Sequence, residues 1–567
     1  MERSQRVPCI KMWRHITVIH PLVEMAIQTL PTSTEILVIG GGPAGSYAAA
    51  ALAREGFEVT LLESANFPRY HIGESLLPSV RPFLTFIGAE ESVMNHGFTI
   101  KPGAAIKLNQ YKREGYTDFI ALNPNNGSWN VIRSEFDDLL FRHASKCGTT
   151  VFDNTRVTEL QFEGERPVSA DWSNASTGVQ GRISFNYLVD ASGRNGIMST
   201  KYLKHRRYNK ALNNVACWGY WDGAGSYMPG TTRQNAIWVE ALEDESGWAW
   251  FIPLHDGSTS IGIVMDQASS NRKKKASRAA SGGCDYNLLH HYREELKRAP
   301  GLLRLIENAT LRNDGTPEAV KSASDFSYSA PSYAGDHFRL AGDSGAFIDP
   351  FFSSGVHLAF TGGLSAALTI AASIRGLCSE EDAQRWHTSK VATSYTRFLL
   401  VVLGTYKQIH NQSMPVMSDV DENNFDRAFD LIRPVIQGTA DVGKALTEDE
   451  LQKTMDFCRH LFAPTDPEMH SAVKARLGPT LTSPGAPVMP EWEVDRLLGD
   501  ADEEAKIVLK EINARKPIHT MYNPTENFGV EEHFGFKAVL TRGKLGLVTD
   551  VPNNDSVILT THDEKAS

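Results

Sequence analysis

The stretch Glu35-Ile-Leu-Val-Ile-Gly-Gly-Gly-Pro-Ala-Gly45 sets the architecture around which the rest of this chain is built. Its apolar, β-branched run at 36–39 predicts a short buried strand that ends in glycines. The three glycine positions of the dinucleotide fingerprint are occupied by Gly40, Gly42 and Gly45. The first allows a tight turn, the second lets backbone approach a pyrophosphate, and the third lets a helix pack closely on the strand. The alanine-rich run at 46–54 then predicts a helix whose first N–H groups point at that pyrophosphate.

A second strand is expected directly after this helix, and it ends in an acid. The apolar run 58–62 is followed by Glu63, at the distance from the glycines where a carboxylate accepts hydrogen bonds from ribose hydroxyls. A glycine-rich turn without a ligand does not account for this acid. Strand, glycines, helix, second strand and terminal acid together predict a bound dinucleotide on a Rossmann-like α/β domain.

Composition limits the class of protein. A chain of 567 residues is too long for one ordinary core, so two or more lobes are expected. A formal net charge of −10 argues against nucleic acid as a partner, because binding phosphates requires a basic face. The cysteines are scattered without the paired spacing of zinc sites, which fits a reducing compartment: Cys9, Cys147, Cys217, Cys284, Cys378 and Cys458. We expect a soluble, cytoplasmic protein without a metal site.

Four parts are expected along the chain. Residues 1–33 form an N-terminal extension, which is disordered unless it is a targeting arm or a short packing helix. Residues 34–375 form the nucleotide-binding core, with an antiparallel substrate sheet inserted at about 200–335. Residues 376–552 form a mainly helical region that covers the substrate, and 553–567 form a polar tail.

One apolar stretch raises the question of a membrane span. Val356–Ile374 is rich in small and apolar residues, but His357 and Thr361 lie within it and glycines recur. A helix buried beneath the bound dinucleotide explains this composition better than a span does. No stable membrane insertion is therefore expected.

Local patterns in the middle of the chain predict further elements. Alternating aromatic and apolar residues predict antiparallel strands at 236–241, 248–252 and 260–265. The polar segment 269–283 contains Arg272-Lys-Lys-Lys275 and is expected to be a mobile surface loop, with a nuclear signal as the alternative. Ser134 is the expected N-cap of a helix, and the best helical patterns farther on lie at 394–412 and 447–462.

Four motifs together resemble the flavin monooxygenase fold of the hydroxybenzoate-hydroxylase type. They are the glycine loop with Glu63, Val131-x-Arg133 with Phe136-Asp137, Asp190-x-x-Gly193, and Gly342-Asp343. They follow one another in the expected order between residue 35 and about 375. The resemblance implies FAD as the cofactor, held by Gly40, Gly42, Ala44, Gly45, Glu63, Arg133 and Asp343.

Two further features resemble the flavin-dependent halogenases. Gly247-Trp-Ala-Trp-Phe-Ile-Pro253 matches the family's W-x-W-x-I-P signature, and Lys101 stands where phenol- and pyrrole-type halogenases carry the lysine that handles the active halogen. The phrases Arg69–Pro78 and Pro350–Gly355 are similar to those of fungal members that act on phenolic polyketides. Phe352 departs from the tryptophan halogenases, which carry a glutamate there. This departure shifts the expected substrate from indole to phenol, whose ring is activated by loss of its own proton.

The resemblance implies a role for each site residue. Ser354 and Gly355 would hold chloride or bromide through backbone amides at a helix start. Lys101 would present the resulting electrophile to the phenol ring, while Trp248 and Trp250 would keep the substrate away from the flavin. FAD would be supplied reduced by a separate flavin reductase and react with O2, because no second glycine fingerprint for NADPH follows in the chain.

Simpler interpretations stay open at this point. Lys101 can be a surface lysine in a turn, the alternating tryptophans can be plain core, and Arg133 can pair with a nearby acid. His71 and His357 are interpreted as core or loop histidines and not as bases. For the whole chain, an aromatic hydroxylase on the same fold and a non-catalytic flavoprotein are the alternatives to a halogenase.

Overall fold

The computed structural model describes residues 29–121, 123–280, 287–412, 460, 465–483, 486–489, 491–499, 502–519 and 531–549. The chain divides into two units, Met1–Pro31 and Thr32–Ser567, and every helix and strand named below belongs to the second. Most of the expected extension 1–33, the tail 553–567 and, apart from His460, the helix expected over 447–462 lie outside the described residues.

The nucleotide-binding sheet is parallel at its centre. Its strands are β1 Ser33–Ile39, β2 Val59–Leu62, β7 Thr150–Phe152, β8 Thr155–Glu163, β9 Arg166–Asn174, β10 Gln180–Asp190, β17 Ala334–Gly335 and β18 Phe338–Leu340. They follow the path β17–β18–β10–β1–β2–β7, in which all pairs are parallel except β17 with β18. β8 and β9 extend the sheet as an antiparallel pair beside β10. The two strands of the glycine fingerprint are therefore neighbours, and the predicted Rossmann-like domain is confirmed.

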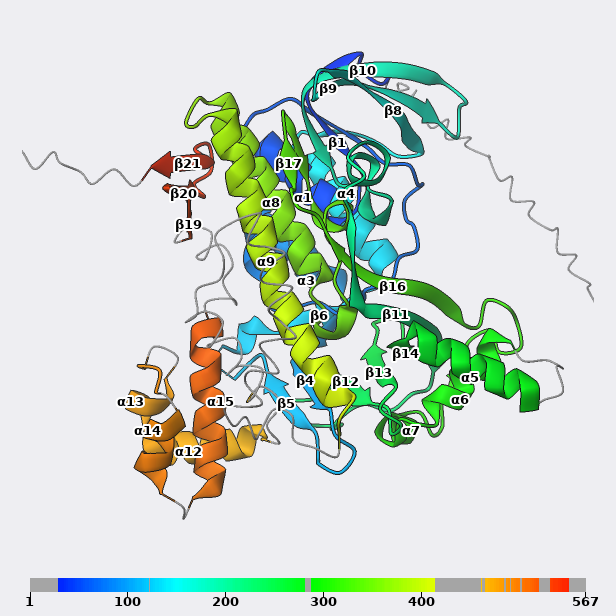
Figure 1. The fold of residues 1–567 in the computed structure, drawn as a ribbon, viewed down its shortest axis with the longest axis vertical. Helices are drawn as coiled ribbons and strands as arrows, with labels where there is room; N and C mark the ends of the chain where they lie inside the picture. The colour runs from blue at the N-terminus through cyan, green and yellow to red at the C-terminus, as the bar shows by residue number, and fades with distance from the viewer. Residues whose placement is uncertain are drawn as a thin grey trace, which may run out of the picture. The chain divides into compact units, whose positions relative to one another are not determined.

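Long helices cover this sheet. They are α1 Pro43–Arg54, α4 Arg133–Lys146, α8 Gly355–Ile374 and α9 Glu380–Ile409. α1 packs against α4 and α8, and α8 and α9 run side by side (Figure 1). Glycines on α8 permit its close approach to the glycine loop, since a Cβ added at Gly363 would lie 2.7 Å from the carbonyl oxygen of Ala44. α8 is long and apolar enough to span a membrane, but 89% of its most apolar window is buried inside the protein.

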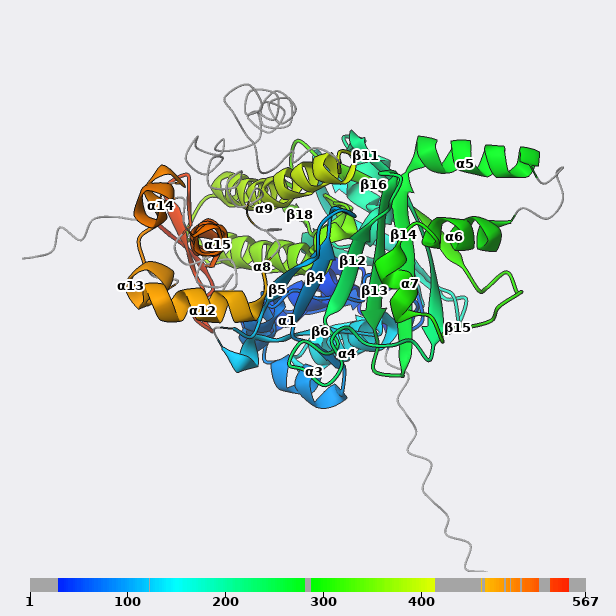
Figure 2. The ribbon, with the colours of Figure 1, turned by 90° about the horizontal axis from the view of Figure 1, so that it is seen from below.

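A second, mainly antiparallel sheet lies beside the nucleotide-binding part. Its strands are β4 Gly103–Lys107, β5 Gly115–Asp118, β11 Arg207–Asp222, β12 Ile237–Ala241, β13 Gly247–Pro253, β14 Ser258–Asp266, β15 Thr310–Leu311 and β16 Lys321–Ser329. The path is β15–β11–β14–β13–β12–β4–β5, with β16 beside β11, and β12–β4 is its parallel pair. Figure 2 shows these strands between α9 and the helices α5 to α7, whose bounds are Gln267–Ala280, Leu288–Leu296 and Pro300–Leu305. The antiparallel sheet expected from the sequence is confirmed, and it also includes β4 and β5, which precede the expected range 200–335 in the chain. Its role towards a substrate stays a prediction.

Side chains alternate across this sheet, and the alternation separates its two faces. Trp248 and Trp250 of β13 belong to the apolar cluster that includes Phe398 and Tyr406 of α9. Ala249 and Phe251 belong instead to the cluster formed with α6 and α7. Successive residues of a strand point to opposite faces, so β13 directs its two tryptophans towards α9 and the nucleotide lobe.

Smaller elements complete the described fold. Near the nucleotide lobe these are α2 Val80–Ile87, α3 Glu90–His96, and the two-stranded ribbon of β3 Thr99–Lys101 with β6 Ser128–Asn130. Towards the C-terminus they are α12 Pro467–Leu477, α13 Pro479–Thr482, α14 Glu491–Leu498, α15 Glu503–His519, and the sheet of β19 Glu532–His533, β20 Phe536–Val539 and β21 Gly546–Thr549. This last sheet packs on α8, where Arg375 donates to the carbonyl of Leu545 at 2.5 Å. The mainly helical C-terminal region therefore also contains strands.

Two local predictions were wrong. The segment expected to be a loop at 269–283 is helical over its described part, because its alanine, lysine and arginine residues favour a helix. The Asp266 carboxylate accepts from the N–H of Ser269 at 2.9 Å, and Lys273 makes an ion pair with Asp244 at 2.6 Å. Ser134 is not an N-cap, since α4 begins one residue earlier with Ile132 in that position.

Candidate functional site

A cavity of about 670 Å³ lies between the nucleotide-binding sheet and the substrate sheet. One end is lined by the glycine loop and by Glu63, and the other by side chains of the substrate sheet. Nine of the residues expected to form the site line this cavity: Gly40, Gly42, Ala44, Glu63, Arg133, Trp248, Trp250, Asp343 and Gly355. Gly45, Lys101 and Ser354 do not line it and lie behind its wall.

The glycines of the loop have different surroundings. A Cβ added at Gly45 would lie 1.9 Å from the carbonyl oxygen of Gly40, and one added at Gly40 would lie 2.2 Å from that of Ala191. Gly40 and Gly45 therefore allow close packing between backbone segments of the chain. A Cβ at Gly42 would meet only the Arg69 guanidinium, at 3.2 Å, and Gly42 faces the cavity. The backbone at Gly42 thus leaves the open approach that a pyrophosphate requires.

Glu63 ends β2 at the edge of the cavity. One carboxylate oxygen accepts from the N–H of Gly41 at 2.6 Å, and the other accepts from Ala65 N–H at 2.7 Å and from the Ser64 hydroxyl at 3.2 Å. A carboxylate has about four acceptor positions, so capacity remains for a ribose hydroxyl. The loop and this fixed acid fit a dinucleotide such as FAD.

Arg133 pairs with a nearby acid, which is the simpler of its two interpretations, and it also borders the cavity, while its contact with a flavin stays a prediction. Its guanidinium forms two hydrogen bonds with the Asp137 carboxylate, at 2.9 and 3.0 Å, and donates to the carbonyl of Ile72 at 2.8 Å. Burial alone would raise the pKa of Asp137, but Arg133 and Arg69 hold that pKa below its usual value. The same positive charge, with burial, lowers the pKa of His71 to about 4. Arg133 therefore fixes segment 71–73 and still borders the cavity.

Two acids follow the carboxyl ends of parallel strands. Asp190 at the end of β10 accepts from the N–H groups of Ser192 at 3.0 Å and Met198 at 2.8 Å, which shapes the loop lining the cavity. Asp343 follows β18, and burial raises its pKa to about 6. If FAD were bound, Asp343 could accept a hydrogen bond from one of its hydroxyls when ionised and donate one when protonated.

The two tryptophans of β13 form part of the opposite wall. Trp248 donates its ring N–H to the Tyr406 hydroxyl at 2.7 Å, and its ring lies edge to face with Phe351 at 4.9 Å between centroids. Trp250 donates to the Ser260 hydroxyl at 3.2 Å. Both rings are fixed by hydrogen bonds, belong to a buried apolar cluster and also border the cavity, so their role towards a substrate stays a prediction.

The start of α8 also borders the cavity. Ser353 has a left-handed backbone with φ of 55°, and Gly355 is the first residue of the helix. The first N–H groups of a helix have no intrahelical acceptor and carry partial positive charge. Gly355 and Val356 line the cavity, whereas the Ser354 side chain is buried behind them. This helix start can hold an anion.

Lys101 is not a surface lysine, because its side chain is 1% exposed. Its ammonium donates to the Ser75 hydroxyl at 2.7 Å and to the carbonyl of Leu76 at 3.0 Å, and lies 5.2 Å from the centre of the Phe119 ring. Burial lowers the pKa of Lys101 to about 7. Ser75 lines the cavity, so Lys101 lies one residue behind the cavity wall.

Glu74 is a cavity residue that the sequence did not single out. Its carboxyl accepts from the Tyr220 hydroxyl at 2.6 Å, and Tyr220 is hydrogen-bonded to Tyr70 at 3.0 Å. Burial raises the pKa of Glu74 to about 7. Glu74 lies in the segment Arg69–Pro78, which resembles fungal halogenases. The sequence feature that could have indicated its role is a charged side chain between Gly73 and Ser75.

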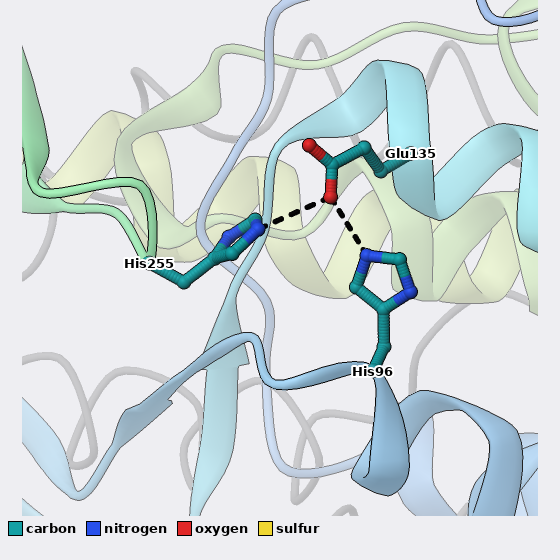
Figure 3. Close-up of side chains that lie close together, drawn as sticks. All are labelled: His96, Glu135 and His255. Atoms are coloured by element: carbon teal, nitrogen blue, oxygen red, sulfur yellow. Dashed lines mark hydrogen bonds and ion pairs between the residues drawn. The ribbon is translucent and has the colours of Figure 1, made fainter. Parts of the chain in front are cut away.

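Within the described residues, one group of side chains has the donor set of a metal site. His96, Glu135 and His255 bring their ligand atoms within 4.8 Å of one another (Figure 3). Both imidazoles contact the same Glu135 oxygen, at 2.7 and 3.1 Å. Two imidazoles and a carboxylate suit zinc and related ions. The two contacts with Glu135 connect α3, α4 and the turn after β13. The expected absence of a metal site stays a prediction.

Comparisons with known proteins agree with this geometry. The family model for an FAD binding domain matches residues 33–393. The flavin-dependent halogenase armH1 of Armillaria mellea is 59% identical over 92% of this chain and 99% of its own length. The sulochrin halogenase gedL of Aspergillus terreus is 46% identical over 92% of this chain and 94% of its own.

A solved structure supports the same fold. The myxobacterial chondrochloren halogenase CndH is 27% identical, with a TM-score of 0.60 over 76% of this chain and 97% of its own. The alternatives of a hydroxylase and of a non-catalytic flavoprotein find no comparable support among these relatives.

Proposed function

The chain belongs to the flavin-dependent halogenases, and on that premise we propose that it chlorinates a phenolic aromatic ring at the cavity between its two sheets. The observation that carries this proposal is the position of Lys101. A buried ammonium one residue behind the cavity wall, next to Ser75, is placed to act on a molecule formed at the flavin.

The cofactor has a consistent place in this proposal. Gly42 and Ala44 would receive the pyrophosphate of FAD, Glu63 the ribose, and Arg133 and Asp343 would border the rest of the molecule. Bound reduced FAD supplies, with oxygen and chloride or bromide, a hypohalous acid. The N–H groups at Gly355 and Val356 would hold the halide, since a helix start attracts anions.

The side chains of this protein direct the halogen to the ring. Trp248 and Trp250 hold the phenol away from the flavin. The phenol is therefore reached by the smaller hypohalous acid and not by the flavin itself. The Lys101 ammonium donates a hydrogen bond to the oxygen of that acid. The ring carbon then bonds to the halogen, and the halogen–oxygen bond breaks with its electron pair on oxygen. The oxygen takes a proton from Lys101 and leaves as water, and the proton lost from the ring carbon restores the ammonium.

A phenol is the substrate class that these residues favour. No ion pair joins Lys101 to a carboxylate among the described residues, and Phe352 stands where a glutamate would assist an indole. A phenol needs less help, because loss of its own proton raises the electron density of the ring. One relative carries the name sulochrin halogenase, and we extend the phenolic class, but not that compound, to this chain.

Reduced flavin comes from a separate reductase in this proposal, because the sequence has one glycine fingerprint. The enzyme would work inside the cell, where reduced flavin and free thiols persist.

The test is an incubation of the protein with a flavin reductase, NADH, FAD, chloride and a panel of phenolic polyketides, with tryptophan as a parallel substrate. Mass spectrometry is expected to find a monochlorinated phenol, and its brominated counterpart when bromide replaces chloride. Hydroxylated phenol without halogen, formed at the same rate with or without halide, would contradict the proposal.

A further inference from the structure

The ribbon that carries Lys101 places several polar side chains on one face. In the pairing of β3 with β6, Lys101 is opposite Ser128 and Thr99 is opposite Asn130. Ser75 pairs with Asn130 from the other side of β6. Residues directly opposite one another, and residues two apart along a strand, share a face of a sheet. We call the group formed by Lys101, Ser75, Ser128 and Asn130 the lysine chamber.

Two members of the lysine chamber are buried without partners. Ser128 and Asn130 are both 0% exposed. The Ser128 hydroxyl and both polar atoms of the Asn130 amide have no hydrogen-bond partner within the described part of the chain. Native proteins pair nearly all buried polar groups, and each unpaired one destabilises the fold. Three unpaired atoms next to a buried ammonium indicate a place that a small polar molecule completes.

We propose that Ser128 and Asn130, with Lys101, bind the hypohalous acid and hold it for transfer to the ring. This inference rests on the proposed function. The donors and acceptors match: the Asn130 carbonyl accepts the O–H of the acid, while Lys101 and Ser128 donate to its oxygen. Either orientation of the Asn130 amide supplies an acceptor and a donor. The halogen makes no hydrogen bond and is left pointing past Ser75, which lines the cavity.

Asn130 supplies a hydrogen-bond acceptor that Lys101 lacks. A lysine by itself has three donors and no acceptor, so it leaves the O–H of the acid unpaired. Asn130 supplies the missing acceptor. Without it the acid is held by fewer hydrogen bonds and escapes into the solvent more often before it meets the phenol.

The experiment compares Asn130→Leu and Ser128→Ala with the wild-type enzyme, supplied with FAD, a flavin reductase, chloride and a phenol. Asn130→Leu keeps the size of the side chain and removes only unpaired atoms, so it should bind FAD and melt no lower than the wild type. Chlorinated product per flavin oxidised should fall about tenfold, as expected for one strong hydrogen bond. Free hypohalous acid, trapped by monochlorodimedone, should rise. In Ser128→Ala, chlorinated product per flavin oxidised should fall about threefold and trapped hypohalous acid should rise about threefold. This variant tests the inference if Asn130→Leu does not fold.

A buried asparagine with partners provides the matched control. Asn214 donates to Asp349 at 2.9 Å and to the Tyr406 hydroxyl at 2.8 Å. Asn214→Leu should therefore melt lower than the wild type, in contrast to Asn130→Leu, because it removes a hydrogen bond that the buried Asp349 carboxylate accepts.

Two outcomes would overturn the inference, and they are distinct. Suppose that Asn130→Leu and Ser128→Ala give as much chlorinated product per flavin and as much trapped hypohalous acid as the wild type, while Lys101→Ala makes no product. The chamber then holds only water, and the proposed function stands. If the wild type yields neither chlorinated phenol nor trapped hypohalous acid, the proposed function fails and the inference fails with it.

Discussion

The nucleotide end of the cavity and the lysine chamber behind its wall differ in how their buried polar groups are paired. At the nucleotide end the Glu63 carboxylate accepts three hydrogen bonds, and Asp137 is held by both Arg133 and Arg69. In the lysine chamber, Ser128 and Asn130 are buried with unpaired atoms. The hydrogen bonds of the first region are made within the protein, whereas those of the chamber would be completed by the hypohalous acid proposed above.

The largest expected effects concern the glycines of the nucleotide end. Gly45→Ala should prevent normal folding of the lobe, because its Cβ would lie 1.9 Å from the Gly40 carbonyl oxygen. Gly42→Val should fold and melt cooperatively but fail to retain FAD, since its added atoms face the cavity. Circular dichroism and flavin absorbance of the purified variants measure the two properties separately. Wild-type FAD content in Gly42→Val would show that the pyrophosphate lies elsewhere.

How far the sequence predicts each region depends on whether its contacts follow a recognisable sequence pattern. The glycine loop is predictable because the dinucleotide fingerprint fixes the spacing of its glycines and of the acid that follows them, so the contact of Glu63 with Gly41 is expected although 22 residues separate the two. Lys101 was identified through a resemblance, but its burial was not foreseen. Its partners Ser75 and Ser128 lie on segments about 26 residues away on either side, and only the ribbon brings them together.

Other differences have equally local causes. Segment 269–283 is helical over its described part although its run of charges predicts a loop, because alanine, lysine and arginine have high helix propensity. The role of Glu74 could not be predicted from its neighbours in the sequence. Its carboxyl accepts a hydrogen bond from Tyr220, which lies far along the chain.

A mutation at Trp250 tests whether the cavity wall differs from ordinary core. Trp250→Ala should lower the free energy of unfolding by about 2 kcal/mol, less than the roughly 3–5 kcal/mol of a fully packed tryptophan, because one side of the ring already borders the cavity. The halogenated products should become less selective in ring position. Urea denaturation and product analysis check the two effects. A loss at the upper end of that range with an unchanged product pattern would make Trp250 plain core.

The pH dependence of halogenation should report the lysine chamber. Burial lowers the pKa of Lys101 to about 7, so the ammonium is present below that pH and is lost as the pH rises through it. Chlorinated product per flavin oxidised should therefore decline as the pH rises through about 7. Glu74 also has a pKa raised to about 7, and Glu74→Gln separates the two groups. If that variant loses the decline, the titrating group is Glu74 and not Lys101.

The smallest expected effect is on stability. Between the pKa of about 7 for folded Lys101 and its ordinary value of 10.5, the unfolded chain holds one more proton than the folded chain. The free energy of unfolding of the wild type therefore rises with pH between about 7 and 10.5. Below about pH 7 the folded protein bears the full cost of burying the ammonium. Lys101→Met removes this dependence, so its stability relative to the wild type should be about 2 kcal/mol more favourable near pH 6 than near pH 9. Denaturation curves at both pH values measure it, and a difference that grows with pH would contradict the buried ammonium.

The central claim is that Lys101 acts on the halogen after the flavin has reacted, and halogenation by Lys101→Ala tests it most directly. The variant should bind FAD and consume oxygen when supplied with reduced flavin, because Lys101 does not line the cavity where the cofactor fits. It should make little or no chlorinated phenol. Lys101→Arg should fail nearly as completely, since a guanidinium is wider, planar and always charged. Substantial chlorination by Lys101→Ala with FAD bound normally would contradict the assignment and direct attention to Lys107 at the end of β4.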